Sequence, residues 1–227
     1  MMAEQPLSSR VGSGSDNSGS DTSGPGGVVS DDVVLSAHII SVATSTRGFL
    51  PEDEADALVR AAADVARRGP LLEIGAYCGR SSVYLGGVAS AADTVLFSVD
   101  HHRGSEENQL GWEWHDPELV DPSTGRMDTL PLFRSAIERA GLEHHVVALV
   151  GDSPVIARHW GTPLALCFID GGHGRAVAHG DYDGWAHHVM ASGLLAIHDV
   201  FPDPAQGGRP PYDPVAMFKA LILCGTE

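Results

Sequence analysis

The fold of this chain is decided by residues 71–82, which read Leu71-Leu72-Glu73-Ile74-Gly75-Ala76-Tyr77-Cys78-Gly79-Arg80-Ser81-Ser82. A short apolar run ends in an acid, two glycines follow four residues apart, and the pattern then becomes helical. Glycine permits backbone conformations and close approaches that other residues resist. A strand that turns through such glycines into a helix presents the helix N-terminus to a ligand. The stretch therefore predicts a strand–turn–helix unit with a ligand site at the turn.

The acid ahead of the glycines indicates the kind of ligand. Glu73 would repel a phosphate at this turn, whereas it would attract the cationic amino-acid tail of a cofactor. The stretch also lacks the Gly-x-Gly-x-x-Gly pattern of dinucleotide sites. Glu73, Gly75 and Gly79 therefore point to S-adenosylmethionine, and a nicotinamide-dependent oxidoreductase is the alternative that this pattern disfavours.

Composition narrows the classes to which the chain can belong. Its 227 residues suit one α/β domain with a tail, and 43% hydrophobic residues are enough for a core. A net charge of -16 argues against nucleic acid or an anionic membrane as a partner. The sequence has no apolar run long enough to span a bilayer and no signal-peptide core. Cys78, Cys167 and Cys224 form no CxxC pair, so we expect a cytoplasmic protein with reduced cysteines.

Strand and helix patterns alternate along most of the chain. Residues 1–30 are rich in Ser, Gly and Asp and are expected to be a disordered tail, so that residues 31–227 form a single domain. Nearly continuous apolar runs predict strands at 71–75, 94–100, 145–151, 164–170 and 193–199. Helices are expected from Pro51 to about Arg68 and at 80–90, 130–140, 153–160 and 175–190. This alternation predicts an α/β fold with a doubly wound, mostly parallel sheet and helices on both faces.

Residues 101–129 interrupt the alternation. The segment is long, polar and aromatic, and a long loop inside a compact domain is usually functional or disordered. Trp112 and Trp114 argue against disorder. The segment is expected to be a lid over the site or a dimer contact, and the sequence does not separate these two roles.

Polar side chains follow every predicted strand. They include Asp100-His101, Asp152-Ser153, Asp170 and His198-Asp199, and five such ends on one edge of a parallel sheet are typical of an active site. Asp100 is placed to accept hydrogen bonds from a ribose. Asp170 and Asp199 end neighbouring strands, where a divalent cation such as Mg²⁺ or Mn²⁺ would relieve their repulsion, although independent helix-capping acids remain an alternative.

The histidines differ in their expected importance. His173 follows Asp170 by three residues and is a candidate proton acceptor, although a loop histidine without a role remains the alternative. His101 and His102 open the segment 101–129. His179, together with Asp181 and Asp183, is expected on the exposed flank of a helix.

Residues 48–212 resemble the class I S-adenosylmethionine-dependent methyltransferases. In that family the acid and glycines of residues 73–79 hold the methionine part of the cofactor, Asp100 matches the acid that binds ribose, and residues 151–153 match the region beside the adenine. Phe168-Ile169-Asp170-Gly171-Gly172-His173 and Leu195-Ala196-Ile197-His198-Asp199-Val200 are similar to the metal-dependent sugar O-methyltransferases of the mycinamicin and macrocin type. The runs 100–108 and Phe201-Pro202-Asp203-Pro204 also resemble methyltransferases of methylmannose polysaccharide synthesis.

The resemblance implies an enzyme that methylates a sugar hydroxyl with help from a divalent metal. Its metal would be held by Asp170, Asp199 and His198, although an acid is usual where His198 stands, and its catalytic base would be His173. The cofactor site is expected to include Glu73, Gly75, Tyr77, Gly79, Ser81, Ser82, Asp100, His101, Asp152, Ser153 and Asp170. The acceptor would be a mannoside, an oligosaccharide precursor or another small molecule, and the enzyme a possible homodimer.

Two alternatives stay open at the level of sequence. One is a methyltransferase that needs no metal, in which Asp170 serves the cofactor or the fold. The other is a protein that binds the cofactor without catalysis, because only 28 residues follow Asp199, where the family normally closes its sheet with an antiparallel hairpin. A shortened hairpin is therefore expected at the C-terminal edge of the sheet.

Overall fold

The computed structural model describes residues 34–112 and 114–199. The expected disordered tail at 1–30, the run 201–204 and the expected shortened hairpin lie outside the described residues. The statements that follow concern the described part of the chain.

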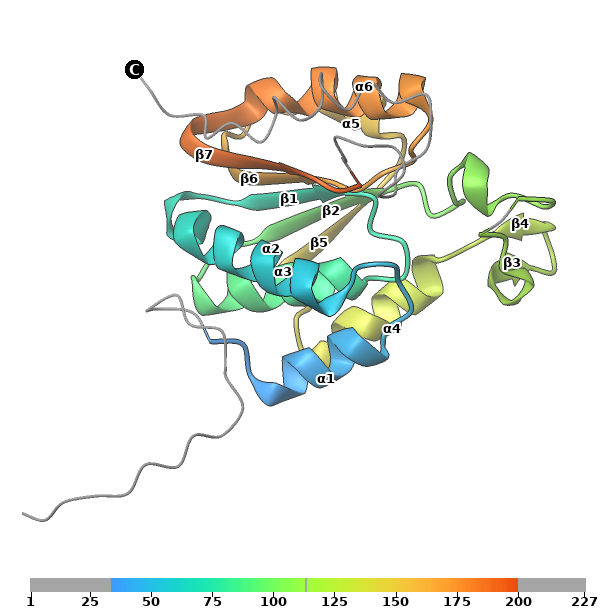
Figure 1. Ribbon diagram of the computed structural model, residues 1–227, viewed down its shortest axis with the longest axis horizontal. Coiled ribbons are helices and arrows are strands. Elements are labelled where there is room, and N and C mark those ends of the chain that lie inside the picture. The colour runs from blue at the N-terminus through green and yellow to red at the C-terminus, as the bar shows by residue number, and fades with distance from the viewer. Residues whose placement is uncertain (1–33, 113, 200–227) are drawn as a thin grey trace, which may run out of the picture.

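A five-stranded sheet forms the centre of the molecule (Figure 1), and neighbouring strands in it run parallel. Its strands are β1 (Leu71–Ile74), β2 (Leu96–Asp100), β5 (Val146–Val150), β6 (Leu164–Ile169) and β7 (Val189–Ile197), in the order β5-β2-β1-β6-β7. Every residue of β1 and β6 is buried, which is why these runs are apolar without alternation. The predicted doubly wound parallel sheet is confirmed, as is the adjacency of the strands that end at Asp170 and Asp199.

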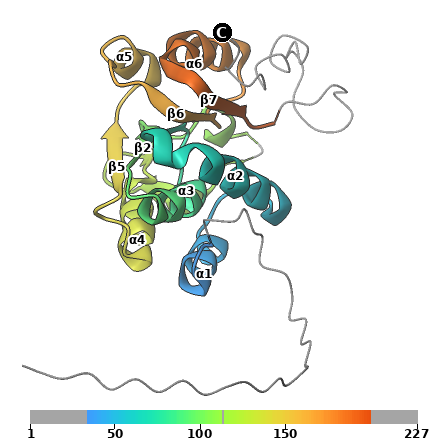
Figure 2. The same cartoon turned by 90° about the vertical axis from the view of Figure 1, so that its left-hand side faces the viewer.

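Helices cover both faces of the sheet (Figures 1 and 2). One face carries α2 (Glu52–Val65), α3 (Arg80–Ala91) and α4 (Leu130–Ala140), with α1 (Ala37–Ser45) packed against α3 and α4. The other face carries α5 (Ser153–Ala157) and α6 (Arg175–Trp185). Two large clusters of buried apolar side chains accordingly fill the molecule, one on each side of the sheet. None of these helices in the described chain is long and apolar enough to cross a bilayer.

The described residues of the 101–129 segment protrude from the carboxyl edge of the sheet (Figure 1). They contain the short helical turns η2 (Glu106–Asn108) and η3 (Pro117–Leu119) and an antiparallel hairpin of β3 (Val120–Asp121) and β4 (Arg126–Met127). In η2 the side chain of Ser105 and that of Asn108 cap each other's backbone, which fixes the orientation of the turn. The segment is therefore a built structure next to the strand ends.

The structure corrects several element boundaries, among them the end of α5, which lies at Ala157 rather than at the expected residue 160. Helix α6 ends at Trp185, a turn η4 (Ala186–His188) follows, and β7 begins at Val189, so the helix expected to reach residue 190 is too long. Helix α2 begins at Glu52, and Pro51 is its N-cap rather than its first residue. The early start of β7 comes from its pairing with β6, where Val189 lies opposite Leu164. The small residues Ala191-Ser192-Gly193 interrupt the apolar run and hide this part of the strand in the sequence.

Candidate active site

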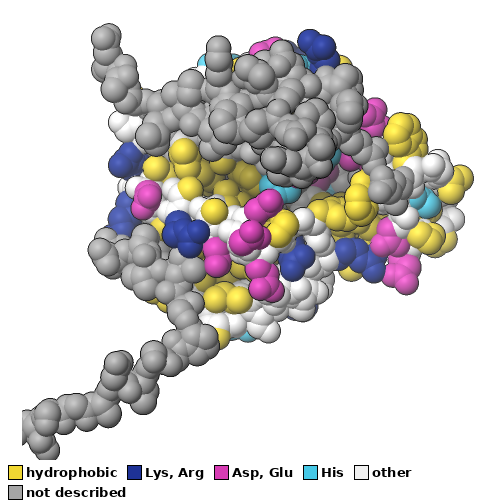
Figure 3. All heavy atoms as spheres, in the orientation of Figure 1, with side chains coloured by type: hydrophobic (Ala, Val, Ile, Leu, Met, Phe, Trp, Pro, Cys, Tyr) yellow, Lys and Arg dark blue, Asp and Glu magenta, His cyan; other side chains and the backbone are white. Residues whose placement is uncertain are grey.

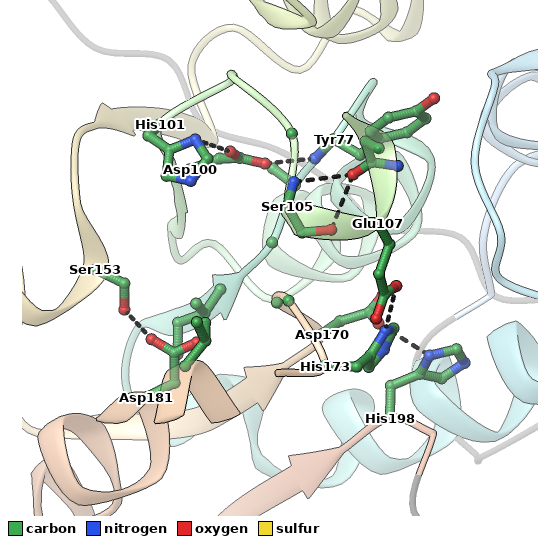
Figure 4. A pocket seen from close by; sticks show the side chains of 18 of the residues that line it. Tyr77, Asp100, His101, Ser105, Glu107, Ser153, Asp170, His173, Asp181 and His198 are labelled. Carbon is green, nitrogen blue, oxygen red and sulfur yellow. Dashed lines mark hydrogen bonds and ion pairs between the residues drawn. The ribbon is translucent and has the colours of Figure 1, made fainter. Parts of the chain in front are cut away.

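A cavity of about 800 Å³ opens at the carboxyl ends of the parallel strands. The strand ends contribute Gly75 after β1, Asp100 of β2, Asp152 after β5, Asp170 after β6 and Asp199 after β7. The wall also contains residues 104–108 and 114 of the protruding segment. Figure 4 shows the polar side chains of these different elements turned toward one space. The layout expected from the sequence is thus present, with ordered chain of the 101–129 segment beside it.

The first turn of the site depends on Gly75. Its φ is +91°, and a Cβ at this position would lie 2.0 Å from the backbone oxygen of Asp170. Only glycine allows the β1 turn and the β6 turn to approach so closely. Gly79, with a φ of +98°, then starts helix α3. Gly75 therefore brings the strand ends of β1 and β6 together, whereas Gly79 packs against Phe133 of helix α4.

Asp100 is held by two backbone groups. Tyr77 N and His102 N each donate to one of its carboxylate oxygens at 2.7 Å. Figure 4 shows the Tyr77 ring pointing away from this carboxylate. Asp100 is therefore fixed in place, while each of its oxygens keeps a lone pair for a ligand hydroxyl.

Glu73 lies beneath the cavity. It is fully buried, its Oε1 accepts hydrogen bonds from the hydroxyls of Ser82 and Ser98, and its Oε2 has no hydrogen-bond partner within the described chain. Burial raises the pKa of Glu73 to about 7 despite the serine contacts. Glu73, Gly79 and Ser82 are the three expected cofactor residues that do not line the cavity, whereas the other eight do.

His173 joins the protruding segment to the end of β7. Its Nδ1 lies 3.0 Å from Glu107 Oε2, and its Nε2 lies 3.1 Å from Asp199 Oδ2. The Asp199 contact, opposed by burial and assisted by Glu107, raises the pKa of His173 to about 9. Reciprocally, the hydrogen bond from His173 and then that from His198 hold the pKa of Asp199 well below its usual range. The two neighbours thus favour the protonated imidazole.

His198 lies against three carboxylates. Its Nδ1 is 2.9 Å from Asp170 Oδ1 and 3.5 Å from Asp199 Oδ2, and its Nε2 is 2.5 Å from Glu54 Oε2 of helix α2. Burial lowers the pKa of His198, but the contacts with Asp170 and Asp199 outweigh burial and raise it to about 11. Burial also raises the pKa of Asp170, against the influence of His198. An imidazolium between these carboxylates offsets their mutual repulsion.

The part of the cavity beside α5 and α6 contains an unexpected buried acid. Asp181 is 2% exposed and accepts a hydrogen bond from the Ser153 hydroxyl at 2.6 Å, and Trp185 Nε1 donates to the same hydroxyl at 2.8 Å. The expectation that Asp181 lies on an exposed helix flank is therefore wrong. The acid faces inward because α6 packs against α5, which the helical pattern of α6 alone does not reveal.

Comparison with known proteins identifies the family. A family model described as a methyltransferase domain matches residues 72–200, more than half of the chain. Among solved structures, cofactor-bound Rv0187 from MTB is 18% identical, with a TM-score of 0.54 over 82% of this chain and 74% of that chain. The Bacillus cereus O-methyltransferase in complex with SAH is 17% identical, with a TM-score of 0.54 over 81% of this chain and 76% of that chain. The O-methyltransferase NovP is 18% identical, with a TM-score of 0.55 over 73% of this chain and 70% of that chain.

The chain belongs to this methyltransferase family. The methyltransferase uses S-adenosylmethionine as its methyl donor, and the similar structures show that its sheet and helices have the methyltransferase arrangement. The nicotinamide alternative is therefore not supported. At these identities the neighbours establish the fold, while the acceptor has to be inferred from the residues around the cavity.

The predicted metal ligands of the methyltransferase lie together but do not form a metal site. Asp170, His198 and Asp199 converge, yet across residues 34–112 and 114–199 no group of three or more His, Cys, Asp or Glu side chains has an arrangement that could hold a metal ion. Nδ1 of His198 is turned toward the two carboxylates, and its Nε2 is turned toward a third. An imidazole ring with a carboxylate next to each nitrogen is arranged to donate a hydrogen bond through both nitrogens. Asp170, His198 and Asp199 in this arrangement therefore do not fit as ligands of the predicted Mg²⁺ or Mn²⁺.

Two polar residues of the methyltransferase site were missed by sequence reasoning. Glu107 and Glu54 contact His173 and His198 across 66 and 144 residues of chain. Glu107 is only 5% exposed. Its one signal in the sequence is its place in the aromatic segment that is expected to be a lid or a dimer contact. Glu54 carries only the signature of the first turn of a helix.

Proposed function

We propose that the enzyme transfers the methyl group of S-adenosylmethionine to a hydroxyl of a saccharide, such as a mannoside, with His173 as the proton acceptor. The observation that carries the proposal is the position of His173 in the cavity wall, held by Glu107 on one nitrogen and facing Asp199 with the other. A histidine at the carboxyl edge of this sheet stands where an acceptor would meet the methyl donor.

The cofactor would lie along the strand ends of β1, β2 and β5. Asp100 would accept hydrogen bonds from the ribose hydroxyls, for which its fixed carboxylate is suited. Asp152 and Ser153 line the cavity on the side assigned to the adenine, and the turn at Gly75 lies on the side assigned to the methionine part. Glu73 lies beneath the cavity wall, so it would affect cofactor binding indirectly, by supporting the conformation of that turn.

The side of His173 that receives the proton would be Nε2. The side chain of Glu107 is 7% exposed and keeps its contact with Nδ1, whereas that of Asp199 is 35% exposed and can give way to an incoming hydroxyl. The hydroxyl proton passes to Nε2 as the oxygen attacks the methyl carbon. The O–CH₃ bond forms while the S⁺–CH₃ bond breaks, and its electron pair stays on sulfur to give S-adenosylhomocysteine. A base with a pKa near 9 is well matched to a weakly acidic hydroxyl.

The divalent metal expected from the sequence takes part in no step of the proposed reaction. Its three predicted ligands are arranged around the His198 imidazole, and that ring would supply positive charge next to Asp170 and Asp199. The proposal is thus the metal-independent version of the sequence prediction. Methyl transfer in the presence of EDTA separates the two versions.

The direct test is product analysis. The purified enzyme would be incubated with S-adenosylmethionine carrying a ¹³C-methyl group and with methyl α-mannoside or a mannose oligosaccharide. The proposal predicts a new ¹³C methyl ether on a sugar carbon in the NMR spectrum and one equivalent of S-adenosylhomocysteine. Binding of S-adenosylhomocysteine by calorimetry, with no methyl ether on any saccharide, would instead support a cofactor-binding protein without this activity.

A further inference from the structure

Three aromatic side chains gather at the outer end of the cavity. Phe49 follows helix α1, Tyr77 follows β1, and Trp114 belongs to the protruding segment, and all three line the cavity. The Phe49 ring centroid lies 5.4 Å from that of Tyr77 and 5.3 Å from that of Trp114. The cluster thus joins three parts of the chain that are distant in sequence.

This aromatic cluster is open to solvent. Phe49 is 54% exposed and Trp114 is 45% exposed, although large aromatic side chains in a folded domain usually bury most of their surface. Figure 3 shows hydrophobic side chains exposed on the side of the molecule that carries the β3–β4 hairpin. Exposed aromatic surface that borders a cavity marks a place where a ligand binds.

An ion pair fixes the cluster in place. Arg47, two residues before Phe49, binds Asp116 at 2.6 Å and Glu118 at 2.7 Å, and both acids belong to the segment that carries Trp114. These two ion pairs connect the residues between α1 and α2 to the protruding segment. Phe49 and Trp114 are therefore presented as a preformed surface.

The charges around the cavity restrict what this surface can bind. Two arginines line the described cavity, of which Arg47 is paired with two carboxylates and Arg80 donates to Gly48 O at 3.1 Å. Seven acids line it as well, namely Asp100, Glu106, Glu107, Asp152, Asp170, Asp181 and Asp199. Protonated His173 and His198 add two cations, so the seven acids still outnumber the four cationic side chains of this wall. Its net negative charge disfavours phosphate and carboxylate groups, whereas its oxygens accept hydrogen bonds from hydroxyls.

We propose that Phe49, Tyr77 and Trp114 form the acceptor subsite, and that it binds an uncharged pyranose ring by its C–H face while excluding phosphorylated or carboxylated acceptors. A pyranose has one face of C–H groups, which are attracted to aromatic faces, and an edge of hydroxyl donors, which matches the carboxylates beside His173. A flat phenolic acceptor would have one or two hydroxyls and would leave most of these carboxylates without a partner. The inference rests on the proposed function in taking the cavity beside His173 as the place of the acceptor.

Saturation-transfer NMR tests the subsite without requiring turnover. Protein aromatic protons would be irradiated in the presence of S-adenosylhomocysteine and, in separate samples, methyl α-mannoside, mannose 6-phosphate or catechol. We expect saturation to reach the ring C–H protons of methyl α-mannoside and to be at least fivefold weaker for mannose 6-phosphate and for catechol. Equal or stronger transfer to mannose 6-phosphate or catechol, or none to the mannoside, would overturn the proposal.

Substitutions in the aromatic cluster test whether the saturation-transfer signal arises there. Phe49→Ala and Trp114→Ala should each reduce the mannoside signal at least fivefold and raise KM for the acceptor saccharide about tenfold with a smaller change in kcat. Trp112→Ala is the matched control, because Trp112 is 52% exposed in the same segment and does not line the cavity. Unchanged affinity for S-adenosylhomocysteine shows that each variant is folded.

The result also separates this inference from the proposed function. Mannoside binding that depends on Phe49 and Trp114, with no methyl transfer, would retain the subsite and reject the activity. Methyl transfer to saccharides that is unaffected by both substitutions would retain the activity and reject the subsite.

Discussion

His173 lies between two carboxylates that come from opposite sides of the cavity. Glu107 belongs to the segment that follows β2, and Asp199 ends the described part of the chain after β7. Two acceptors on one imidazole stabilise its protonated form, so the resting enzyme at neutral pH holds mostly imidazolium. The neutral imidazole that can accept a proton is then a minor species.

The pH dependence of the reaction follows from this balance. Because the pKa of His173 in the free enzyme is raised to about 9, kcat/KM should rise roughly tenfold per pH unit from pH 6 to about 8 and level off above about pH 10. Glu107→Gln removes one of the groups that raise this pKa, so the inflection should move to lower pH. Glu106→Gln is the control, because it removes the same charge from the same cavity wall. A pH profile identical in wild type and Glu107→Gln would show that Glu107 does not position the base.

Because Glu73 is a buried acid, we expect the stability of the folded protein to depend on pH. The pKa of this fully buried acid is raised to about 7 from an ordinary 4.5, so the folded state holds its proton over a range in which the unfolded chain has lost it. Stability is therefore lost as pH rises through this range. The unfolding free energy of wild type relative to Glu73→Gln should fall by about 2–3 kcal/mol between pH 5 and pH 8. Urea titrations of both proteins at the two pH values measure the difference, and a constant difference would contradict a buried, poorly solvated carboxyl.

Site residues differ in how visible they are in the sequence. Asp170, His198 and Asp199 could be placed together because each ends a strand, and strand ends of a parallel sheet share an edge. Glu107 could not, because it lies inside the 101–129 segment and its partner His173 lies 66 residues further along the chain. The arrangement of His198 as a hydrogen-bond donor to acids, rather than as a metal ligand, also depends on Glu54, which lies 144 residues away.

Among the secondary-structure elements, helices whose ends carry clear sequence signals agree best with the prediction. Helix α4 spans the expected residues 130–140, with Pro131 in its first turn and Gly141 in the left-handed conformation at its end. Helix α1 was not predicted, because its apolar face of Ile39, Val42 and Ala43 is short. The hairpin of β3 and β4 was also missed, since strands of two residues carry no periodicity.

The turn between β1 and α3 is the element on which the site depends most. Gly75→Ala places a Cβ against the Asp170 backbone and adds the strain of a positive φ, so we expect a loss of more than about 3 kcal/mol of stability or loss of cofactor binding. Gly111→Ala is a matched control, because Gly111 has a φ of +92° with nothing within 4 Å of its Cβ position. That change should cost only about 1 kcal/mol, the strain alone, and leave cofactor affinity unchanged. Calorimetric titration with S-adenosylhomocysteine and thermal unfolding measure both effects, and equal losses in the two variants would contradict the importance of the close approach.

At the scale of the whole molecule, parallel strands collect acids at one edge while helices bury both faces. With a net charge of -16, the chain has few cations to place among them, and His173 and His198 supply positive charge inside the cavity. Apolar runs could predict the parallel sheet, because strands buried on both faces are continuous in hydrophobicity. The balance of charge in the cavity could not be predicted, since it depends on how all the strand ends meet.

The charge balance inside the cavity predicts how methyl transfer responds to metal ions. Because the His198 imidazole faces Asp170 and Asp199, methyl transfer should keep at least half its rate in EDTA, and added Mg²⁺ or Mn²⁺ should not raise it more than twofold. His198→Asp would restore the pair of adjacent acids expected from the sugar O-methyltransferases and should bind Mg²⁺ measurably by calorimetry. Loss of activity in EDTA with recovery on Mg²⁺ would show instead that the wild-type residues hold a metal.

The most direct measurement is kcat for methyl transfer by wild type and His173→Ala, at pH 8.5 and saturating S-adenosylmethionine, with the affinity for S-adenosylhomocysteine determined in parallel. Removal of a general base is expected to lower kcat about 10²–10⁴-fold. The dissociation constant should stay within about twofold, because the proposal places His173 beside the acceptor rather than beside the cofactor. A His173→Ala variant that keeps more than half of the wild-type kcat would contradict proton transfer to His173.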